Sequence, residues 1–393
     1  MNTVAMAETS LAVAETFDIT EETGFLPSED PLVRFELDTH PPELRSYLAA
    51  FDELGKKLPD LLEGCEARLQ IEALPAPPDG LFDELNDREV LRLCLLSGFF
   101  ASGYVNQFDS EPVDRLPEGV AIPLYRTSKR LGRKPMLSYD LLCLHNFQRR
   151  DPESGLTLDN LDTLQQFTTY PDERWFVVVH VAIEAAAGPG LLAMAHAQQA
   201  ARRDDPDSVR AHLDTVAESL DAQTTYMSRM TEGNDPAVFA TEFRPYYGGF
   251  EDVVYEGVDE LGGEPQTLRG GSGAQSCVLP SLDSALGIEH ASTALLEKLL
   301  DMRTYMPERH RRVIDAFADD VDLREYVLET ESQTLEASFN RCLDELRRFR
   351  NVHFGQVMQY IASQTGDTTG TGGTDYSEFL GRLEEETVEH KIS

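Results

Sequence analysis

The chain has 393 residues, enough for roughly two to three ordinary domains. Hydrophobic residues make up 41% and charged residues 26%, a composition typical of globular proteins rather than disordered or fibrous ones. The formal net charge is -36, from 70 acidic and 34 basic residues, which argues against a nucleic acid or anionic membrane as partner because both need Lys and Arg to neutralise phosphates.

Cysteine usage and the N-terminal composition indicate a reducing compartment. The five cysteines are widely spaced and form no C-x-x-C pair, which argues against a disulfide framework, a cysteine-rich zinc site and covalent c-type haem attachment. The first 30 residues are acidic and lack the basic region and apolar core of a signal peptide. We therefore expect a soluble cytoplasmic protein, and the acid surplus would also suit a high-salt cytoplasm.

The N-terminal part predicts a small domain of mixed structure. Residues 1–23 are expected to form a flexible acidic tail. Apolar residues at helical spacing predict a helix over residues 43–62, and residues 90–100 have the composition of a buried helix. Residues 116–137 contain three prolines, so we expect short strands there and no long helix. These elements and their linker are assigned to a domain over residues 24–150.

The remainder predicts a large all-helical domain over residues 151–393. Helical patterns recur over residues 159–167, 175–187, 191–203, 208–229, 281–306 and 332–363. The most apolar segment, residues 175–187, is too short to span a bilayer and is interrupted by His180 and Glu184. No strand–helix alternation is present, which argues against a Rossmann-type sheet. The predicted fold class is therefore mainly α.

Several common catalytic motifs are absent from the sequence. No two histidines have the H-E-x-x-H spacing of a zinc helix, and no G-x-S-x-G elbow marks a serine hydrolase. Two glycine-rich loops, residues 270–273 and 370–374, lack the lysine of a phosphate-binding P-loop. Zinc peptidases, serine hydrolases and P-loop nucleotide enzymes are thus poor first choices.

His353 is the most suggestive of the nine histidines. On the predicted last long helix it shares an apolar face with Leu346, Phe349, Val357 and Tyr360. An inward imidazole needs a hydrogen-bond partner or a metal, and a satisfied core histidine is the commoner case. A single histidine from a long helix, facing open apolar space, would also suit five-coordinate haem iron. The pattern leaves both interpretations open.

Several short sequence motifs occur in a fixed order over nearly the whole chain. They are Gly24-Phe25-Leu26-Pro27, Leu58-Pro59-Asp60-Leu61-Leu62, Thr127-Ser128-Lys129-Arg130-Leu131, Val254-Tyr255-Glu256-Gly257, the loop 270–276, Asp301-Met302-Arg303-Thr304-Tyr305-Met306-Pro307, and Gly370-Thr371-Gly372-Gly373-Thr374-Asp375. In this order they resemble the indoleamine 2,3-dioxygenase family, haem enzymes that open the indole ring of tryptophan. The resemblance implies that the larger domain binds haem b and that the smaller one covers the distal pocket.

The resemblance implies roles for the residues that hold the haem. His353 matches the family's proximal iron ligand, in agreement with its place on the apolar helix face. Arg350, one turn earlier, matches the arginine near a haem propionate, and Asp283 resembles its acidic partner. A helix–helix salt bridge is the alternative interpretation of this second pair, and both interpretations can hold together.

The resemblance also assigns the substrate side of the pocket. Phe239 matches an aromatic wall over the indole. Arg244 matches a guanidinium for the substrate carboxylate, a group that arginine can bind through two parallel hydrogen bonds. Without the family, Arg244 would be interpreted as half of a surface ion pair. No histidine is assigned as a distal base.

Further positions match the floor and the loops around the substrate. Tyr139 and Leu142 resemble the floor of the indole pocket, although alone they would be interpreted as ordinary buried residues. Ser272 and Gly273 match the loop that closes over the haem edge. Thr374 matches the mobile loop that meets the substrate's ammonium group, with a flexible linker as the alternative.

One substrate-side position departs from the family pattern. Animal members have a distal serine after a run of three alanines, where this chain has Gly188. We therefore expect a hydroxyl that could bond oxygen or substrate to be lost. The pocket should gain room, with consequences for substrate affinity and specificity.

The function implied is haem-dependent cleavage of the C2–C3 bond of L-tryptophan, or of a related indoleamine, by O2. The product would be N-formylkynurenine, in the first step of the kynurenine pathway. The expected partners are O2, the indole substrate and an unidentified reductant that keeps the iron ferrous, and the chain is expected to be a monomer. The alternatives are a haem oxygenase acting on another indole in secondary metabolism, a non-catalytic haem protein that binds O2, and a purely structural helical protein.

Overall fold

The fold is mainly α, as predicted, in a computed structural model that describes residues 9–108, 110–290, 293–366 and 376–392. The helices in the described residues are α1 (Ser10–Thr16), α2 (Pro42–Glu63), α3 (Ala67–Glu72), α4 (Leu81–Glu84), α5 (Asp87–Val105), α6 (Glu118–Arg130), α7 (Pro171–Arg202), α8 (Pro206–Ser228), α9 (Pro236–Val238), α10 (Val278–Ala285), α11 (Thr293–Arg303), α12 (Glu308–Asp319), α13 (Leu323–Thr330), α14 (Gln333–Val357), α15 (Ser363–Thr365) and α16 (Tyr376–Glu389). The strands are β1 (Arg115–Leu116), β2 (Gln148–Arg149), β3 (Leu161–Asp162), β4 (Phe250–Tyr255) and β5 (Gln266–Leu268). Turns of π-helix lie at Asp140–Leu144, Phe239–Phe243 and Met358–Ala362.

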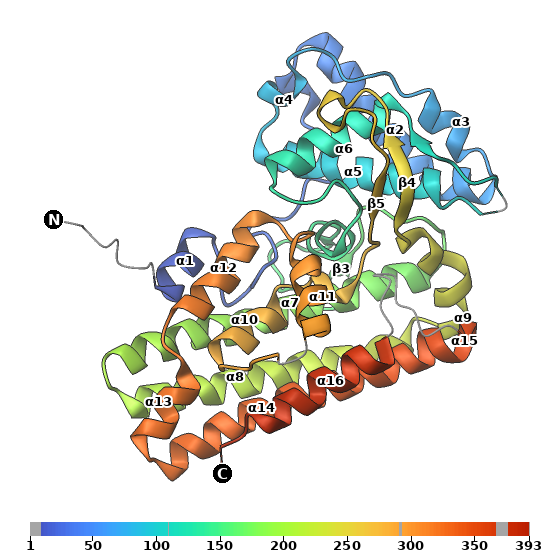
Figure 1. Cartoon of the computed structure of the whole chain (residues 1–393). Helices are drawn as coiled ribbons and strands as arrows, with labels where there is room; N and C mark the ends of the chain where they lie inside the picture. The colour runs from blue at the N-terminus through green and yellow to red at the C-terminus, as the bar shows by residue number, and fades with distance from the viewer. Residues whose placement is uncertain (1–8, 109, 291–292, 367–375, 393) are drawn as a thin grey trace.

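Long helices form the lower part of the molecule in Figure 1. α7 packs along α8, α8 packs along α14, and α16 lies against α14. On α14 and the π turn after it, the predicted apolar face is buried at Leu346, Phe349 and Tyr360. The predicted extent of this helical segment, residues 332–363, agrees with α14, the π turn and α15 together. His353 is therefore carried by a rigid helix whose inner face is fixed by packing.

α7 is one continuous helix, so the expectation of two helices over residues 175–187 and 191–203 is wrong. The intervening glycines allow close packing instead of a break, because a Cβ added at Gly190 would lie 2.6 Å from the hydroxyl of Ser219 on α8. By length and composition α7 could cross a membrane, but 67% of its most apolar window is buried inside the protein. Its apolar composition is accounted for by this burial.

The upper part of the molecule in Figure 1 contains α2 to α6, with β4 and β5 laid across them. β1 pairs in parallel with β4, with Arg115 opposite Val254, and β4 pairs antiparallel with β5. Because β4 and β5 come from the second half of the chain, this upper part is not one continuous segment. The domain limits of 24–150 and 151–393 stay predictions.

Two local predictions about the middle of the chain are wrong. Residues 116–137 contain the long helix α6, which tolerates Pro123 in its interior and buries Leu124 in the core. Residues 159–167 form strand β3 and an irregular segment rather than a helix. There the buried carboxylate of Glu173 accepts the backbone N–H of Phe167 at 2.9 Å, a bond that replaces a helical partner.

The N-terminal segment packs against the helical part of the molecule. α1 contacts α7 and α12 and buries Leu11 and Val13. The backbone N–H of Ser10 donates to the carboxylate of Asp320 at 2.8 Å. The prediction of a flexible tail is thus wrong for residues 10–23, because the apolar side chains among the acidic ones form a buried face. Residues 1–8 lie outside the described part of the chain.

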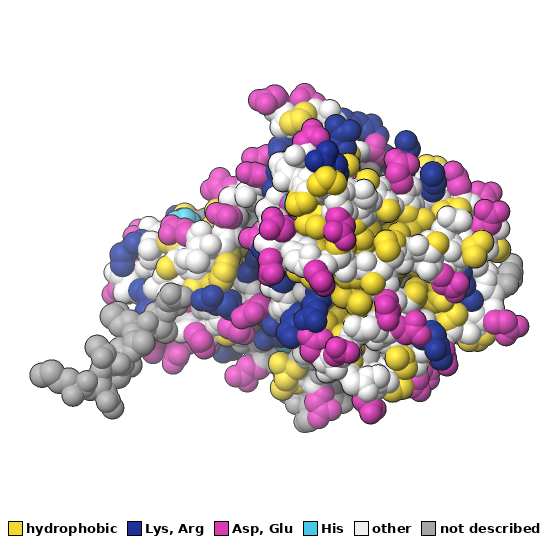
Figure 2. Space-filling view, turned by 90° about the horizontal axis from the view of Figure 1, so that it is seen from above, with side chains coloured by type: hydrophobic (Ala, Val, Ile, Leu, Met, Phe, Trp, Pro, Cys, Tyr) yellow, Lys and Arg dark blue, Asp and Glu magenta, His cyan; other side chains and the backbone are white. Residues whose placement is uncertain are grey.

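Acidic side chains are distributed over the molecular surface. Figure 2 shows Asp and Glu scattered over the face seen from above, with Lys and Arg between them. Some basic side chains are engaged in ion pairs, such as Arg92 with Asp52 at 2.6 Å and Arg126 with Glu260 at 2.5 Å. On this face the negative charge is therefore spread out rather than gathered in one patch.

Candidate active site

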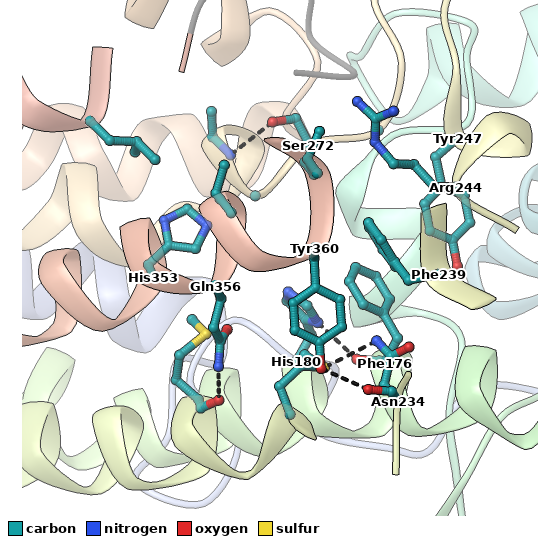
Figure 3. Close-up of a pocket in the computed structure, with 18 of the residues that line it drawn as sticks. Phe176, His180, Asn234, Phe239, Arg244, Tyr247, Ser272, His353, Gln356 and Tyr360 are labelled. Carbon is teal, nitrogen blue, oxygen red and sulfur yellow. Dashed lines mark hydrogen bonds between the residues drawn. The ribbon is translucent and has the colours of Figure 1, made fainter. Parts of the chain in front are cut away.

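A cavity opens where α7, α8, α14, the turn after α9 and the glycine loop 270–274 converge (Figure 3). Its empty volume is about 1130 Å³, which includes space open to solvent at the mouth. Its apolar and aromatic lining comes from Phe176, Met227, Met230, Phe239, Tyr247, Met302, Val357, Tyr360, Ile361 and Leu380. The main polar side chains are those of His180, Asn234, Arg244, Ser272, Lys298, His353 and Gln356.

His353 lines this cavity from α14. In the described part of the chain neither of its ring nitrogens has a hydrogen-bond partner. Burial lowers the pKa of His353 to about 4, and the neighbouring His180 acts in the same direction. The imidazole is therefore neutral at pH 7 and carries an available nitrogen lone pair. Of the two interpretations left open by the sequence, a satisfied core histidine does not agree with this geometry.

The surroundings of His353 fit a haem group. Haem iron is commonly held by one neutral imidazole nitrogen, and His353 presents one without a competing partner in the described residues. The aromatic and aliphatic walls suit the apolar face of a porphyrin. Two cationic side chains on the wall, Arg244 and Lys298, are suited to carboxylates such as haem propionates or an amino-acid carboxylate.

Phe239 and Arg244 both reach the cavity, as the resemblance implied. Phe239 begins the π-helical turn after α9, and Arg244 follows that turn. The Phe239 ring lies 5.2 Å from the ring of Phe176 and 5.6 Å from that of Tyr360. In Figure 3, Phe239 and Arg244 stand on one side of the view and His353 on the other. This arrangement can pack an aromatic ring and receive a carboxylate.

The glycine loop places Ser272 and Gly273 on the cavity wall. The Ser272 side chain accepts the backbone N–H of Ala274 at 3.3 Å, which closes a short turn. A Cβ at Gly271 would overlap the end of the Leu142 side chain, which would have to move aside. Thr374, the other predicted loop residue, lies outside the described residues.

Tyr139 and Leu142 lie one layer behind the cavity rather than forming its floor. Leu142 packs beneath Gly271. The hydroxyl of Tyr139 donates to the buried carboxyl group of Glu184 at 2.9 Å, and Ser276 donates to the same oxygen at 2.7 Å. Burial raises the pKa of Glu184 to about 7, while these two hydrogen bonds oppose the rise. The two predicted floor residues therefore support the wall.

Arg350 and Asp283 form a buried ion pair outside the cavity. One guanidinium nitrogen lies 2.7 Å from both carboxylate oxygens of Asp283. A second nitrogen donates to the carbonyl of Leu383 at 3.0 Å and to Thr387, both on α16. The structure thus shows the helix–helix salt bridge, and no observation connects either residue to a cofactor. Their predicted place beside a propionate stays a prediction.

Gly188 does not face the cavity, so the prediction of a roomier pocket is wrong. A Cβ at this position would lie 2.6 Å from the carbonyl oxygens of both Thr20 and Glu21. Gly188 is small because the N-terminal segment crosses α7 there. The α7 side chains that do line the cavity are Phe176 and His180, two to three turns earlier.

Sequence reasoning missed His180 and Lys298. His180 was visible as a histidine in an apolar stretch, one helical turn from Phe176, but no spacing rule said that this face meets His353. Lys298 lies on α11, whose sequence gives little indication of a binding site. Both positions depend on how distant helices are assembled, which single-sequence periodicity does not record.

Comparison with known proteins agrees with this geometry. The family model described as "Indoleamine 2,3-dioxygenase" matches residues 13–390. The chain is 30% identical to indoleamine 2,3-dioxygenase 1 of Mus musculus, over 100% of this chain and 99% of that protein. It is 29% identical to indoleamine 2,3-dioxygenase 1 of Rattus norvegicus, over 99% and 98% of the two chains. An indoleamine 2,3-dioxygenase of Aspergillus candidus is 30% identical over 95% of this chain and 96% of its own length.

The match extends over nearly the whole sequence and includes α14, the turn after α9 and the glycine loop. These are the elements that bring His353, Phe239, Arg244 and Ser272 to one cavity. The chain belongs to the indoleamine 2,3-dioxygenase family.

Proposed function

We propose that this protein is a haem-dependent dioxygenase that cleaves the C2–C3 bond of L-tryptophan, or of a closely related indoleamine, with O2 to form N-formylkynurenine. This would be the first step of the kynurenine pathway. The observation that carries the proposal is a neutral imidazole, His353, with no partner in the described residues, facing an apolar cavity that also receives Phe239 and Arg244. Membership of the family supports the same class of reaction.

Each group has a separate task in this reaction. His353 would hold the iron through a ring nitrogen. When bound, ferrous haem b supplies the binding and activation of O2. Phe239 packs against the indole and Arg244 binds the carboxylate, so the ring is held in one orientation while the apolar lining excludes water. Because both atoms of O2 enter the product, the overall reaction consumes no external electrons, and a reductant serves only to keep the iron ferrous.

The remaining partners in this proposal are O2, the indole and an unidentified reductant. We place the protein in a reducing cytoplasm as a monomer, without nucleic-acid or membrane partners. The five cysteines are free thiols, which supports a reducing compartment. The formal net charge of -36 would repel phosphates.

Isotope labelling tests the reaction directly. Haem-loaded protein is reduced without oxygen and then given L-tryptophan and ¹⁸O₂, and the product is analysed by mass spectrometry. We expect N-formylkynurenine that carries two labelled atoms. A His353→Ala preparation treated in the same way provides the background. Absence of labelled product from reducible wild-type protein would reject tryptophan as the substrate.

The same experiment separates the main alternative, insertion of one oxygen atom into another indole. That reaction would leave a single labelled atom in the product. The feature of the sequence that favoured it, Gly188, lies outside the cavity, so the structure gives it no specific support.

A further inference from the structure

Lys298 is a cationic side chain on the cavity wall to which the proposed reaction gives no task. It lies on α11 and is half-buried, and Met302, one turn later on the same helix, also lines the cavity. Residues four apart are neighbours on one face of a helix. α11 therefore turns this face toward the cavity, and Lys298 belongs to it.

α11 is held against the glycine loop by several contacts. Asp301 forms an ion pair with Arg269, just before that loop. The backbone N–H of Arg269 also donates to the hydroxyl of Tyr305, just after α11, at 2.8 Å. The helix contacts the turn Gly273–Gln275 of the loop as well. A helix fixed in this way keeps the ammonium group of Lys298 at a defined edge of the cavity.

Lys298 has no ion pair or hydrogen bond within the part of the chain that the structure describes. Asp301, three residues later, would be a suitable partner on the same helix, but its carboxylate pairs with Arg269. Glu297 is exposed, and adjacent residues on a helix do not face each other. The ammonium group is therefore available to a bound anion.

Two arginines that could compete for such an anion have other tasks. Arg350 donates to the carboxylate of Asp283 and to the carbonyl of Leu383, and it does not line the cavity. Arg244 is the group that the proposed reaction uses for the carboxylate of the substrate. Haem b brings two further carboxyl groups, its propionates, which are ionised at pH 7. In a chain of net charge -36 these anions are stabilised by a nearby cation.

We propose that the ammonium group of Lys298 binds a propionate carboxylate of the haem and helps to retain the cofactor. This inference rests on the proposed function, because it needs haem b in this cavity. A hydrogen bond between an ammonium group and a carboxylate is among the stronger ones in proteins. His353 at the iron and Lys298 at a carboxylate hold the porphyrin at two separated points, which fixes its orientation in the cavity.

Haem loss from the loaded protein tests this contact without relying on turnover. Ferric protein is mixed with an excess of apomyoglobin, which captures released haem, and the change in absorbance gives the dissociation rate. Lys298→Met keeps the length of the side chain and removes its charge, so haem should leave about 3- to 30-fold faster than from the wild type. Lys298→Arg should restore most of the retention. Lys57→Met, at an exposed position on α2 outside the cavity, is the matched control and should not change the rate.

A modified cofactor then locates the interaction at the carboxylates. In haem dimethyl ester both propionates are neutral, while the iron and the porphyrin ring are kept. Wild-type protein and Lys298→Met loaded with the ester should lose it at the same rate, because the ester offers the lysine no anion. The comparison of two proteins with two cofactors isolates the pairwise interaction from other effects of the substitution.

Three results would overturn the inference, in variants whose urea midpoints show that they are folded. Equal haem loss from wild type and Lys298→Met would exclude the contact, and so would an equal acceleration with haem and with the ester. Normal haem retention but weaker tryptophan binding in Lys298→Met would place Lys298 at the substrate carboxylate instead.

The proposed function fails separately from this contact. A protein whose haem retention depends on Lys298 but which converts no tryptophan would keep the contact and lose the reaction. A protein that converts tryptophan and releases haem equally fast with or without the lysine would keep the reaction and lose the contact.

Discussion

Two imidazoles reach one cavity from different helices, and their hydrogen bonds distinguish them. His180 is tied through Nδ1 to the backbone of its own helix. His353 has no hydrogen bond in the described residues, and burial disfavours its charged form. The His353 ring is partly exposed to the cavity, so a metal held there could be reached by a ring nitrogen.

His353→Ala is therefore expected to lose most of the bound haem. The measurement is the ratio of haem to protein after purification, together with the absorption spectrum. His212→Ala is a suitable control, because His212 on α8 does not line the cavity. A normal haem content and spectrum in His353→Ala would reject this residue as the ligand.

Arg244→Ala should weaken the use of tryptophan while haem content stays normal. A hydrogen-bonded charge is worth about 1.5–3 kcal/mol, which corresponds to a fall of roughly 10- to 160-fold in kcat/KM. Steady-state kinetics with L-tryptophan and with indole, which has no carboxylate, measure the effect. Arg244→Lys keeps the charge without the planar guanidinium group, so its kcat/KM for tryptophan should lie between those of the wild type and Arg244→Ala. Unchanged kinetics with tryptophan would exclude Arg244 as the carboxylate anchor.

The sequence predicted part of this site for identifiable physical reasons. The inward position of His353 could be predicted because helical periodicity fixes which residues share a face. Phe239 and Arg244 were selected by the family resemblance. Gly188 was misplaced because a glycine after three alanines does not reveal whether it faces a ligand or a crossing chain. His180 was missed because its hydrogen bond to a backbone carbonyl, and its place opposite α14, arise only from packing.

Helix α7 shows how a segment that crosses a helix can limit the size of the residue at the crossing point. Gly188→Ser would place side-chain atoms against the carbonyl oxygens of Thr20 and Glu21, so we expect a loss of about 1–3 kcal/mol in the free energy of unfolding. Urea denaturation measures it. The KM of the folded variant should not change, because Gly188 does not line the cavity.

Gly355→Ala provides the control for Gly188→Ser. Gly355 lies on α14, and a Cβ added there would meet open space. This variant should be as stable as the wild type or slightly more stable, since alanine is the better helix former. A Gly188→Ser protein of wild-type stability and altered KM would restore the interpretation of Gly188 as a pocket residue.

Ionisable side chains lie where α16 packs against the rest of the protein. The pKa of Asp283 is lowered: burial opposes the shift, but the charge of Arg350 and the hydrogen bond from His290 outweigh it. The pKa of His290 is raised: burial again opposes the shift, but Asp283 and Glu386 outweigh it. Asp283 thus stabilises the fold above its ordinary pKa, and this contribution is lost as the pH falls through the lowered value.

His290 gives the opposite pH dependence and a second test at this scale. Its contribution is complete below pH 6.5 and is lost as the pH rises through the raised pKa. We expect the urea midpoint of the wild-type protein to fall as the pH rises above 6.5 and through the raised pKa of His290. His290→Gln, which cannot titrate in this range, should show a smaller fall. Identical pH profiles of the two proteins would exclude His290 as the titrating group.

Helices with a clear apolar face were predicted more reliably than those fixed by their neighbours. α2, α8 and α14 follow their sequence periodicity closely. α6 was missed because Pro123 suggested a break, yet burial of the helix around it stabilises the continuous form. The order of α1 was also missed, since the acidic composition concealed its short buried face.

For the whole molecule, the net charge of -36 is a destabilising term that salt can reduce. Like charges spread over a compact surface repel one another, and the Debye length falls from about 10 Å at 0.1 M salt to about 3 Å at 1 M. We therefore expect the thermal unfolding midpoint to rise as KCl increases over this range. The same midpoint measured in increasing sucrose at constant low salt controls for general solute effects. A midpoint that falls or stays constant with KCl would exclude charge repulsion as an important term.

The turns of π-helix offer a way, besides substitution, to change which side chains line this cavity. Phe239 lies in one such turn, Tyr360 and Ile361 in another, and Leu142 lies behind the wall in the third. A π turn accommodates one residue more than an α turn within the same stretch of helix. Gain or loss of a single residue there would exchange the side chain that faces the ligand while the flanking turns keep their packing. Homologous enzymes could thus acquire new substrate preferences through one-residue insertions and deletions as well as through substitutions.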